Sequence, residues 1–235
     1  QSDTPLRSGF RYGDIDVDPQ SIKIWKQLSS RLCDHRVHQY GDPQGDLLLR
    51  EQVADYVNRS RGCHCSADQI AIVNGSQQAL DIIARMFITP GDSVIVEEPG
   101  YQAAKAVFQA AGATVLPNAV DTDGMQTERL SKLNSKARLI YVTPSHQFPT
   151  GSILSLSRRL ALLEWADQQQ CYIVEDDYDS EFRFEGRPIA ALQGLDESAR
   201  TLNIGTFSKV LFPALRIGYV ILPHHLVETF IALRW

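Results

Sequence analysis

The sequence predicts an α/β protein in which a largely parallel sheet lies between helices, and three observations support this prediction. Short apolar segments alternate with amphipathic helical segments from Ile70 onward. The apolar segments lack the alternation of polar and apolar residues that marks a half-exposed strand, which indicates a sheet covered on both faces. Strands and helices follow one another in turn, which is typical of a doubly wound sheet.

The composition is that of an ordinary globular protein and excludes several functional classes. The chain has 235 residues, of which 43% are hydrophobic and 22% charged, enough for one large or two small domains. A formal net charge of −5 argues against a nucleic-acid-binding surface on this segment. The sequence shows no signal peptide and no apolar run near the ~20 residues that span a bilayer. Four scattered cysteines do not make a disulfide scaffold and indicate a reducing, cytoplasmic compartment.

The first sixty residues predict two helices joined by a turn. Residues 1–20 are polar and turn-rich, and Ser21–Val37 then shows a helical rhythm of apolar residues. The segment Tyr40–Gly45, with the sequence YGDPQG, predicts a turn. Leu47–Arg59 predicts a second helix. Its candidate core positions are Leu48, Val53, Tyr56 and Val57.

The remainder of the chain predicts a complete sheet and therefore one whole domain. Seven strands are expected, at Ile70–Val73, Ser93–Glu97, Thr114–Leu116, Leu139–Thr143, Tyr172–Glu175, Thr201–Ile204 and Ile217–Leu222. Helices are expected at Ser76–Phe87, Tyr101–Ala111, Thr127–Lys132 and Ser157–Gln169, and His225–Trp235 begins another.

The predicted site centres on Lys209. This lysine follows a Thr-Phe-Ser turn between two predicted strands, where an α/β sheet presents residues to a crevice. A lysine amine in such a place can act as a nucleophile toward an aldehyde. Arg216 supplies a permanent bidentate clamp for an anion, and the hydroxyls of Thr206 and Ser208 add donors. A lysine that can form a Schiff base beside a phosphate cup suggests pyridoxal phosphate.

Two further segments are predicted to complete the walls of this crevice. The sequence NGSQQAL (74–80) runs from a strand through a glycine into a helix, and its Ser76 and helix N-terminus form an anion site. Taken alone, such a start is usually an N-cap, but opposite Arg216 it predicts the other wall of a phosphate cup. The sequence EEPGY (97–101) brings Tyr101 to the same edge, where its ring is suited to stacking on a planar heteroaromatic ring. The alternative is a tyrosine that simply packs at a helix start.

Three acidic residues and a tyrosine, Glu175 to Tyr178, end a buried strand and need partners. A carboxylate beside a pyridine nitrogen keeps that nitrogen protonated and makes the ring an electron sink. The Tyr178 phenol could bond the 3-hydroxyl of the ring. A divalent-metal site is the rival interpretation, but no second acidic cluster supports it. The segment Cys63–Cys65 could be half of a metal site, yet no second pair stands at zinc-like spacing, and no metal is predicted.

These motifs together resemble the fold-type I, pyridoxal-phosphate-dependent aminotransferases of the aspartate aminotransferase superfamily. The segments NGSQQAL, EEPGY, TPSHQFPTG, EDDYDSEF and GTFSKVLFPALRIGY occur in the order of that superfamily and cover the chain from about Tyr40 to its end. TPSHQFPTG and EDDYDSEF are most similar to the aminotransferase-like domain of MocR/GabR-type transcription regulators of the GntR family. The resemblance implies the large domain of that fold, with a seven-stranded, mostly parallel sheet in a three-layer α/β/α arrangement. It also implies that Ile217–Leu222 is an antiparallel strand.

The resemblance assigns a role to each site residue. It implies that Lys209 forms the Schiff base with pyridoxal phosphate, that Asp176 pairs with the pyridine nitrogen and that Tyr178 contacts the phenolic oxygen of the ring. Asp176 is preferred to Asp177 because the aspartate of the family is the first of the pair. The other implied contacts are ring stacking by Tyr101 and phosphate binding by Ser76, Gln77, Thr206, Ser208 and Arg216. In relatives, the tyrosine that matches Tyr40 reaches the phosphate of the neighbouring subunit, which implies a homodimer with shared sites.

Two departures from the family pattern limit this assignment. Ordinary aminotransferases have an asparagine before Pro-Thr-Gly, where Phe148 stands here, and His146 or Gln147 is expected to take over its contact with the cofactor. The chain also ends before the C-terminal small domain, which in the family carries an arginine for the substrate carboxylate. We expect residues 1–40 to belong to the small-domain and dimer region, residues 41–223 to form the large domain, and residues 224–235 to begin the interdomain helix. An N-terminal DNA-binding domain is expected to lie outside the chain, which starts at Gln1 rather than Met.

Two functions fit these features. The first is the effector-sensing domain of a transcription regulator that responds to an amine, an amino acid or pyridoxal phosphate and contacts DNA only through another domain. The second is a free-standing aminotransferase, in which Lys209 moves a proton between substrate and cofactor. Phe148 favours the regulator. A nucleotide-binding Rossmann domain is excluded because no glycine fingerprint follows the first strand.

Overall fold

The computed structural model describes residues 17–32, 40–133, 136–180 and 189–234. Eight strands form one sheet in the order β1-β8-β7-β6-β5-β2-β3-β4. The strands are β1 (Ile70–Val73), β2 (Ser93–Glu98), β3 (Thr114–Asp121), β4 (Gly124–Met125), β5 (Ala137–Val142), β6 (Tyr172–Asp177), β7 (Thr201–Thr206) and β8 (Gly218–Ile221).

The sheet is mostly parallel, as predicted. Strands β3, β2, β5, β6 and β7 pair in parallel, and β8 runs antiparallel to both β1 and β7. The predicted number of seven strands was wrong, because β4 adds an eighth. This strand has two residues and pairs antiparallel with the end of β3, so it is too short to leave a pattern in the sequence.

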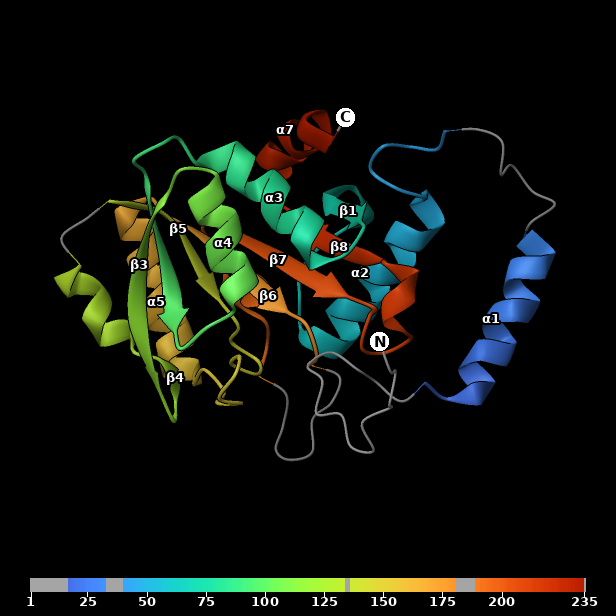
Figure 1. Ribbon diagram of the computed structural model, residues 1–235, viewed down its shortest axis with the longest axis horizontal. Helices are drawn as coiled ribbons and strands as arrows, with labels where there is room; N and C mark the ends of the chain where they lie inside the picture. The colour runs from blue at the N-terminus through green and yellow to red at the C-terminus, as the bar shows by residue number, and fades with distance from the viewer. Residues whose placement is uncertain (1–16, 33–39, 134–135, 181–188, 235) are drawn as a thin grey trace, which may run out of the picture.

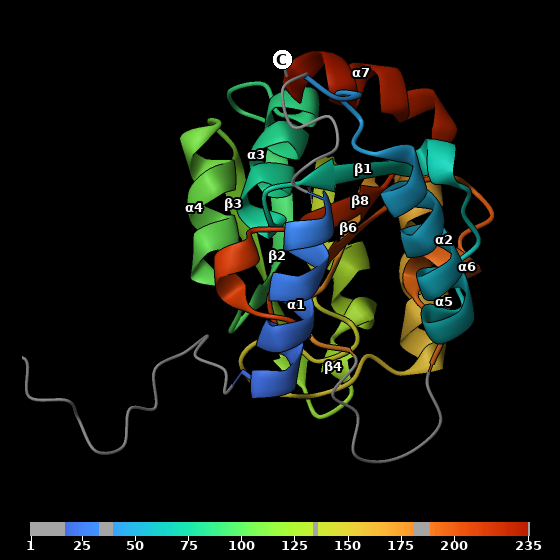
Figure 2. The same cartoon turned by 90° about the vertical axis from the view of Figure 1, so that its right-hand side faces the viewer.

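Helices cover both faces of the sheet and give the predicted three layers. The α-helices are α1 (Pro19–Leu32), α2 (Leu47–Arg61), α3 (Ser76–Phe87), α4 (Gln102–Ala110), α5 (Leu156–Gln169), α6 (Leu192–Leu195) and α7 (His224–Arg234). Figure 2 shows α3 and α4 on one side of the sheet and α2, α5 and α6 on the other, with α7 across the end near β1. Helix α1 projects from the body of the molecule (Figure 1).

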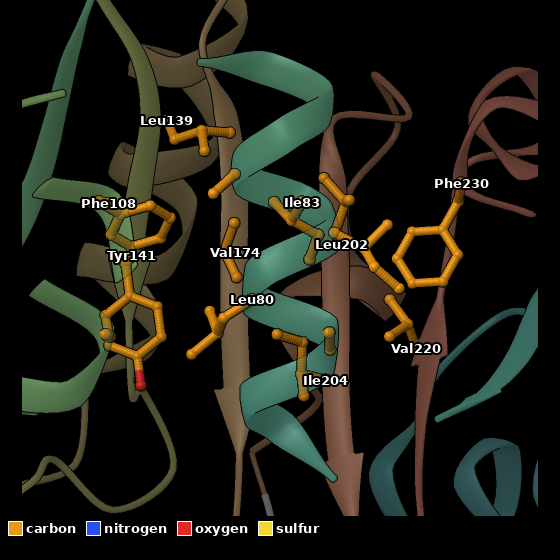
Figure 3. Packing of buried hydrophobic residues seen from close by; sticks show 14 of the residues in the cluster. Leu80, Ile83, Phe108, Leu139, Tyr141, Val174, Leu202, Ile204, Val220 and Phe230 are labelled. Carbon is orange, nitrogen blue, oxygen red and sulfur yellow. The ribbon is translucent and has the colours of Figure 1, made fainter. Parts of the chain in front are cut away.

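The largest core lies between α3 and the central strands. Leu80 and Ile83 of α3 belong to the same buried cluster as Val174 of β6 and Leu202 of β7, and Figure 3 shows these side chains directed toward one another. Phe230 of α7 closes the cluster at the β8 end. Burial of this apolar surface supplies most of the stabilisation and fixes α3 against the sheet. The N-terminus of α3 is thereby held at one edge of the sheet.

The sequence predicted the positions of the helices better than the burial of their residues. Val53 and Val57 of α2 are buried, but Leu48 is exposed, so its prediction as a core residue was wrong. The segment Thr127–Lys132 is helical as predicted, in the 3₁₀ form. The short helix α6 was not predicted. The apolar residues of α1 are exposed, although their spacing correctly indicated a helix; they are Ile22, Trp25, Leu28 and Leu32.

The strand directions gather the predicted site at one edge of the sheet. Because β2, β5, β6 and β7 are parallel, their carboxyl ends lie side by side. In the register of β6 and β7, Asp176 lies opposite Ile204 and Asp177 lies opposite Gly205. The loops that leave this edge carry Tyr101, Tyr178 and Lys209. This is the place where α/β sheets bind ligands.

Candidate functional site

A cavity of about 200 Å³ opens at this edge and contains most of the residues predicted for the site. Its walls come from the N-terminus of α3, the ends of β5 and β6, and the turn around Lys209. The lining residues are Gly75, Ser76, Gln77, Tyr101, Tyr141, Thr143, Phe148, Asp176, Tyr178, Thr206, Ser208, Lys209, Pro213 and Arg216.

One end of the cavity is a cradle for an anion. Helix α3 begins there after Gly75, whose φ of 90° suits glycine, and the positive end of the helix dipole faces the cavity. A Cβ atom on Gly75 would lie 2.9 Å from Nη2 of Arg216, so any larger residue would displace the guanidinium from this position. Arg216 Nη2 donates to the carbonyl of Asn74 at 3.1 Å. This contact fixes the arginine at the mouth of the helix.

Two hydroxyls, those of Thr206 and Ser208, line the same cavity. The backbone N–H of Ser208 donates to Oγ1 of Thr206 at 3.2 Å, and the two side-chain oxygens are 3.0 Å apart. The turn that orients them also presents Lys209. A cation, two hydroxyls and a helix N-terminus are a donor set that suits a phosphate group.

Neighbouring carboxyls at the end of β6 have separate partners. Successive side chains of a strand point to opposite faces, and Asp176 lines the cavity whereas Asp177 faces away from it. Asp177 Oδ2 accepts from Nε of Arg61 at 2.6 Å in a buried ion pair. Arg61 also donates to the hydroxyl of Ser145 at 2.5 Å. Asp176 is thus the carboxyl of the two that faces the cavity, and its predicted contact with a ring nitrogen stays a prediction.

Asp176 forms the other end of the cavity. Its Oδ2 accepts from the hydroxyl of Tyr141 at 2.7 Å, whereas its buried Oδ1 has no hydrogen-bond partner. Burial raises the pKa of Asp176 to about 7, and the Tyr141 hydrogen bond opposes that rise. An unpartnered carboxyl oxygen in a low dielectric costs free energy until a positively charged donor reaches it. A protonated ring nitrogen is such a donor.

Three aromatic rings line the cavity between its two ends. Phe148 contacts Tyr101 edge to face at a centroid distance of 5.8 Å and Tyr178 at 6.3 Å. The side-chain amide of Gln77 donates to the hydroxyl of Tyr101 at 3.2 Å. These rings provide flat apolar surfaces for a planar ligand. Phe148 therefore faces the cavity itself.

Two residues predicted for the site are not among those that line the cavity. His146 Nδ1 lies 2.9 Å from Oδ1 of Asp179, and this histidine forms no part of the cavity wall. Tyr40 is fully exposed and lies with Gly41, Pro43 and Arg234 at a separate hollow. Neither residue reaches the cavity within this chain.

Several lining residues were not found from the sequence. Tyr141 and Thr143 looked like core residues of a predicted strand, and only the pairing of β5 with β6 brings the Tyr141 hydroxyl to Asp176. Pro213 lies on a 3₁₀ turn before Arg216. The one available signal was the polar group of Tyr141 in an otherwise apolar strand, since a buried tyrosine hydroxyl needs a partner.

The described residues were also searched for metal-binding clusters and membrane-spanning helices. Within these ranges, no three His, Cys, Asp or Glu side chains come together as a metal site requires. Cys63 is buried, and burial raises the pKa of its thiol well above the usual value. Among the described helices, none has the length and apolar character needed to cross a bilayer.

Comparison with known proteins agrees with this geometry. The class I and II aminotransferase family matches residues 9–234. The chain belongs to this family. Its members are in general dependent on pyridoxal phosphate. The chain is 41% identical over 229 residues to the probable rhizopine catabolism regulatory protein MocR of Rhizobium meliloti, covering 96% of the chain and 46% of that protein.

Enzymes are also similar to the chain. It is 36% identical over 197 residues to the aromatic-amino-acid aminotransferase 1 of Thermococcus litoralis, with 81% of the chain and 47% of the enzyme covered. The crystal structure of Pyrococcus horikoshii kynurenine aminotransferase has the same fold, with a TM-score of 0.86 at 32% identity over 93% of the chain and 57% of the enzyme. The chain therefore spans about half the length of the curated relatives it matches.

The residues of the cavity fit pyridoxal phosphate. The unpartnered oxygen of Asp176 suits a protonated pyridine nitrogen, and the Gly75–Arg216 cradle suits the phosphate. Lys209 lines the same cavity. The cavity thus offers groups suited to the ring nitrogen, the phosphate and the aldehyde of this cofactor.

Proposed function

We propose that this chain is the pyridoxal-phosphate-binding, effector-sensing part of a MocR-type transcription regulator. One observation carries the proposal: a lysine, an unpartnered carboxyl oxygen and an arginine cradle line a single cavity in a chain that matches 96% of its length to such a regulator. That match leaves more than half of the regulator outside the alignment. DNA contact is then the task of another part of the protein, in keeping with the net charge of −5 here.

In this proposal each wall of the cavity has a task. The N-terminus of α3, Thr206, Ser208 and Arg216 bind the phosphate, and Tyr101 and Tyr178 flank the ring. Asp176 holds a proton on the ring nitrogen. When bound, pyridoxal phosphate supplies an aldehyde that condenses with an amine and a ring that accepts electron density. The effector is then a small amine or amino acid, because an amine competes with the Lys209 amine for that aldehyde, or pyridoxal phosphate itself.

Sensing requires two conformations with different affinity for the effector. Lys209 lies on the turn between β7 and β8, beside Phe207, which contacts Tyr219 of β8. Release of the lysine from the cofactor would therefore act on a turn that is packed against the sheet. We propose that the protein works in the cytoplasm, where transcription regulators of this type bind DNA.

We further propose a homodimer in which each copy completes the site of the other. Residues 1–40 would belong to the dimer and small-domain region, residues 41–223 to the cofactor domain and residues 224–235 to the interdomain helix. Tyr40 is fully exposed and outside the cavity, so it is available to a second copy. Helix α1 presents Ile22, Leu28 and Leu32 to solvent, and such a face requires a cover. Sedimentation of the intact protein tests this, and a monomer at micromolar concentration would contradict it.

The site is tested by trapping the cofactor. Borohydride treatment of the intact protein with pyridoxal phosphate should leave a reduced adduct on Lys209, identified by peptide mass. Lys209→Ala should abolish the adduct, while Lys105→Ala, a control lysine on α4, should retain it. An equal yield of adduct in the Lys209→Ala variant would refute the assignment.

A free-standing aminotransferase is the second candidate. It is favoured by the 36% identity to the Thermococcus litoralis enzyme, and both functions need the same cavity. Turnover of an amino acid with a keto acid by the intact protein, at rates near the ~10 s⁻¹ median of enzymes, would favour the enzyme. Effector-dependent DNA binding without turnover would favour the regulator.

A further inference from the structure

The two loops that form the aromatic wall are joined by one buried side chain. Gln147 is 1% exposed, and its Nε2 donates to the carbonyl oxygens of Pro99 at 2.9 Å and Phe148 at 2.6 Å. The same nitrogen lies 3.2 Å from Oε2 of Glu97. Its Oε1 accepts from the backbone N–H of Thr150 at 3.1 Å and from the Thr150 hydroxyl at 2.7 Å. Both polar atoms of the amide are therefore engaged.

Glu97 extends this network to a third segment. Its Oε2 accepts from the backbone N–H and the hydroxyl of Thr143, at 3.1 and 2.6 Å. The Thr143 hydroxyl in turn accepts from the backbone N–H of Phe148 at 3.0 Å. The ends of β2 and β5 and the loop after β5 are thus tied together by buried hydrogen bonds. A buried network whose members are satisfied favours one arrangement of the segments that it joins.

The carboxyl and amide side chains of the network lie behind the cavity wall, whereas Thr143 is part of that wall. Tyr101, Thr143 and Phe148 line the cavity, whereas Glu97 and Gln147 are not among the lining residues. Tyr101 follows Pro99 by two residues, and Phe148 is the neighbour of Gln147 in sequence. Gln147 can therefore act on a ligand only through lining residues that the network holds, and Tyr101 and Phe148 are the aromatic ones among them.

We infer that Gln147 is a positioning residue that holds Tyr101 and Phe148 at the spacing that receives the cofactor ring. This inference rests on the proposed function, because it takes the ligand to be a planar heteroaromatic ring with a phosphate. It assigns Gln147 a role different from a direct cofactor contact in place of the asparagine of ordinary aminotransferases. The anion cradle at Gly75 and Arg216 is built from other segments and should not depend on Gln147.

The test separates the ring from the phosphate in the intact protein. Two probes are titrated: pyridoxamine 5′-phosphate, followed by its fluorescence, and inorganic phosphate, followed by phosphorus NMR. Gln147→Leu keeps the size of the side chain and removes its hydrogen bonds. We expect the Kd of pyridoxamine 5′-phosphate to rise about tenfold, as for loss of preorganised contacts. The Kd of inorganic phosphate should stay the same.

Two further variants control for general loosening of the structure. Gln193→Leu is the matched control, because Gln193 also bridges two segments, by bonds to the backbone N–H and carbonyl of His64 at 2.9 Å each. It lies outside the cavity lining and should change neither Kd. Thr150→Val removes one donor to Gln147 from an exposed position and should raise the Kd of pyridoxamine 5′-phosphate about threefold, within the range of one hydrogen bond. Thr150→Val provides the test of the network if Gln147→Leu does not fold.

The outcomes distinguish the inference from the proposed function. A wild-type protein that does not bind pyridoxamine 5′-phosphate refutes both. Wild-type binding with no change in either variant overturns the positioning role and leaves the proposed function intact. An equal rise in the Kd of both probes also overturns the positioning role, since it would show general loosening. A rise confined to pyridoxamine 5′-phosphate supports it.

Discussion

The two ends of the cavity are built on opposite physical principles. The end proposed for phosphate uses an exposed arginine, half-buried hydroxyls and a helix N-terminus. The end proposed for the ring nitrogen uses Asp176 and Tyr141, both at most 4% exposed. At the first end, the Arg216 guanidinium is exposed and water can still solvate its charge. The second is a desolvated carboxyl whose free energy depends on what binds to it.

This difference predicts how each end of the cavity contributes to the affinity for the cofactor. An exposed charge is screened by water and salt, so its contribution depends on ionic strength. A buried, unpartnered carboxyl oxygen destabilises the protein without the cofactor and stabilises the complex. We therefore expect substitutions at the two ends to differ in sign for stability and in salt dependence for binding.

The largest effect is expected for Asp176→Asn. The variant keeps the shape of the side chain but cannot pair with a protonated ring nitrogen, so pyridoxamine 5′-phosphate should lose about 2 kcal/mol or more of binding free energy, which is about 30-fold in Kd. The free energy of unfolding without cofactor should rise, because a neutral amide replaces a buried carboxyl. Fluorescence titration and urea denaturation measure the two quantities.

The neighbouring carboxyl provides the control. Asp177→Asn removes the partner of buried Arg61 and should lower the free energy of unfolding, with a smaller effect on Kd. Equal behaviour of the two variants would show that the separation of Asp176 from Asp177 has no functional meaning.

A smaller effect is expected for Arg216→Ala. Because Arg216 is exposed, loss of its charge-assisted hydrogen bond to a phosphate should cost about 1.5 kcal/mol, or about tenfold in Kd. The affinity for pyridoxal, which lacks the phosphate, should not change. Arg216→Lys keeps the charge but loses the paired donors of the guanidinium, so its Kd should lie between those of wild type and Arg216→Ala. Dialysis followed by absorbance measures how much cofactor each variant retains.

The two ends of the cavity should also differ in how their contribution to cofactor binding depends on ionic strength. The difference in Kd between wild type and Arg216→Ala should shrink as salt rises from 50 to 500 mM, levels that span Debye lengths from about 14 to about 4 Å. The difference for Asp176→Asn should change much less. Equal salt dependence at the two ends would contradict the contrast between an exposed and a buried site.

The same contrast explains what the sequence could predict. The anion end is encoded by residues close together in the chain, a glycine before a helix and a lysine seven residues before an arginine. The backbone geometry around Gly75 and Arg216 then agrees with the local pattern. Asp176 was assigned through family resemblance; in the structure it lines the cavity, whereas Asp177 pairs with Arg61.

The buried end and the network behind it depend on pairing between distant segments. Tyr141 reaches Asp176 across 35 positions of sequence, and Gln147 reaches Glu97 across 50. No local pattern distinguishes these residues from ordinary core or loop residues. In α1 the local pattern is clear but the partner is not: the spacing of Ile22 and Leu28 predicts a helix, but it does not predict which surface covers these exposed residues.

The smallest effect is expected for stability against pH in the protein without cofactor. Burial raises the pKa of Asp176 and of Glu97 to about 7, from ordinary values near 4. A carboxyl with a raised pKa binds a proton more tightly in the folded state, so its contribution to stability is complete below the unfolded pKa. That contribution is lost as pH rises from about 4 through about 7.

Thermal unfolding at intervals from pH 4.5 to 8 measures this loss. The melting temperature without cofactor should fall over this range, by a few degrees for each kcal/mol in a chain of this size. The melting temperature of Asp176→Asn should fall less, since one carboxyl with a raised pKa has been removed. Bound pyridoxamine 5′-phosphate should flatten the profile by pairing with ionised Asp176. A melting temperature that rises steadily toward pH 8 in the wild type, and equally in Asp176→Asn, would mean that Asp176 is already paired in the free protein. The ring end of the cavity would then no longer differ from the phosphate end.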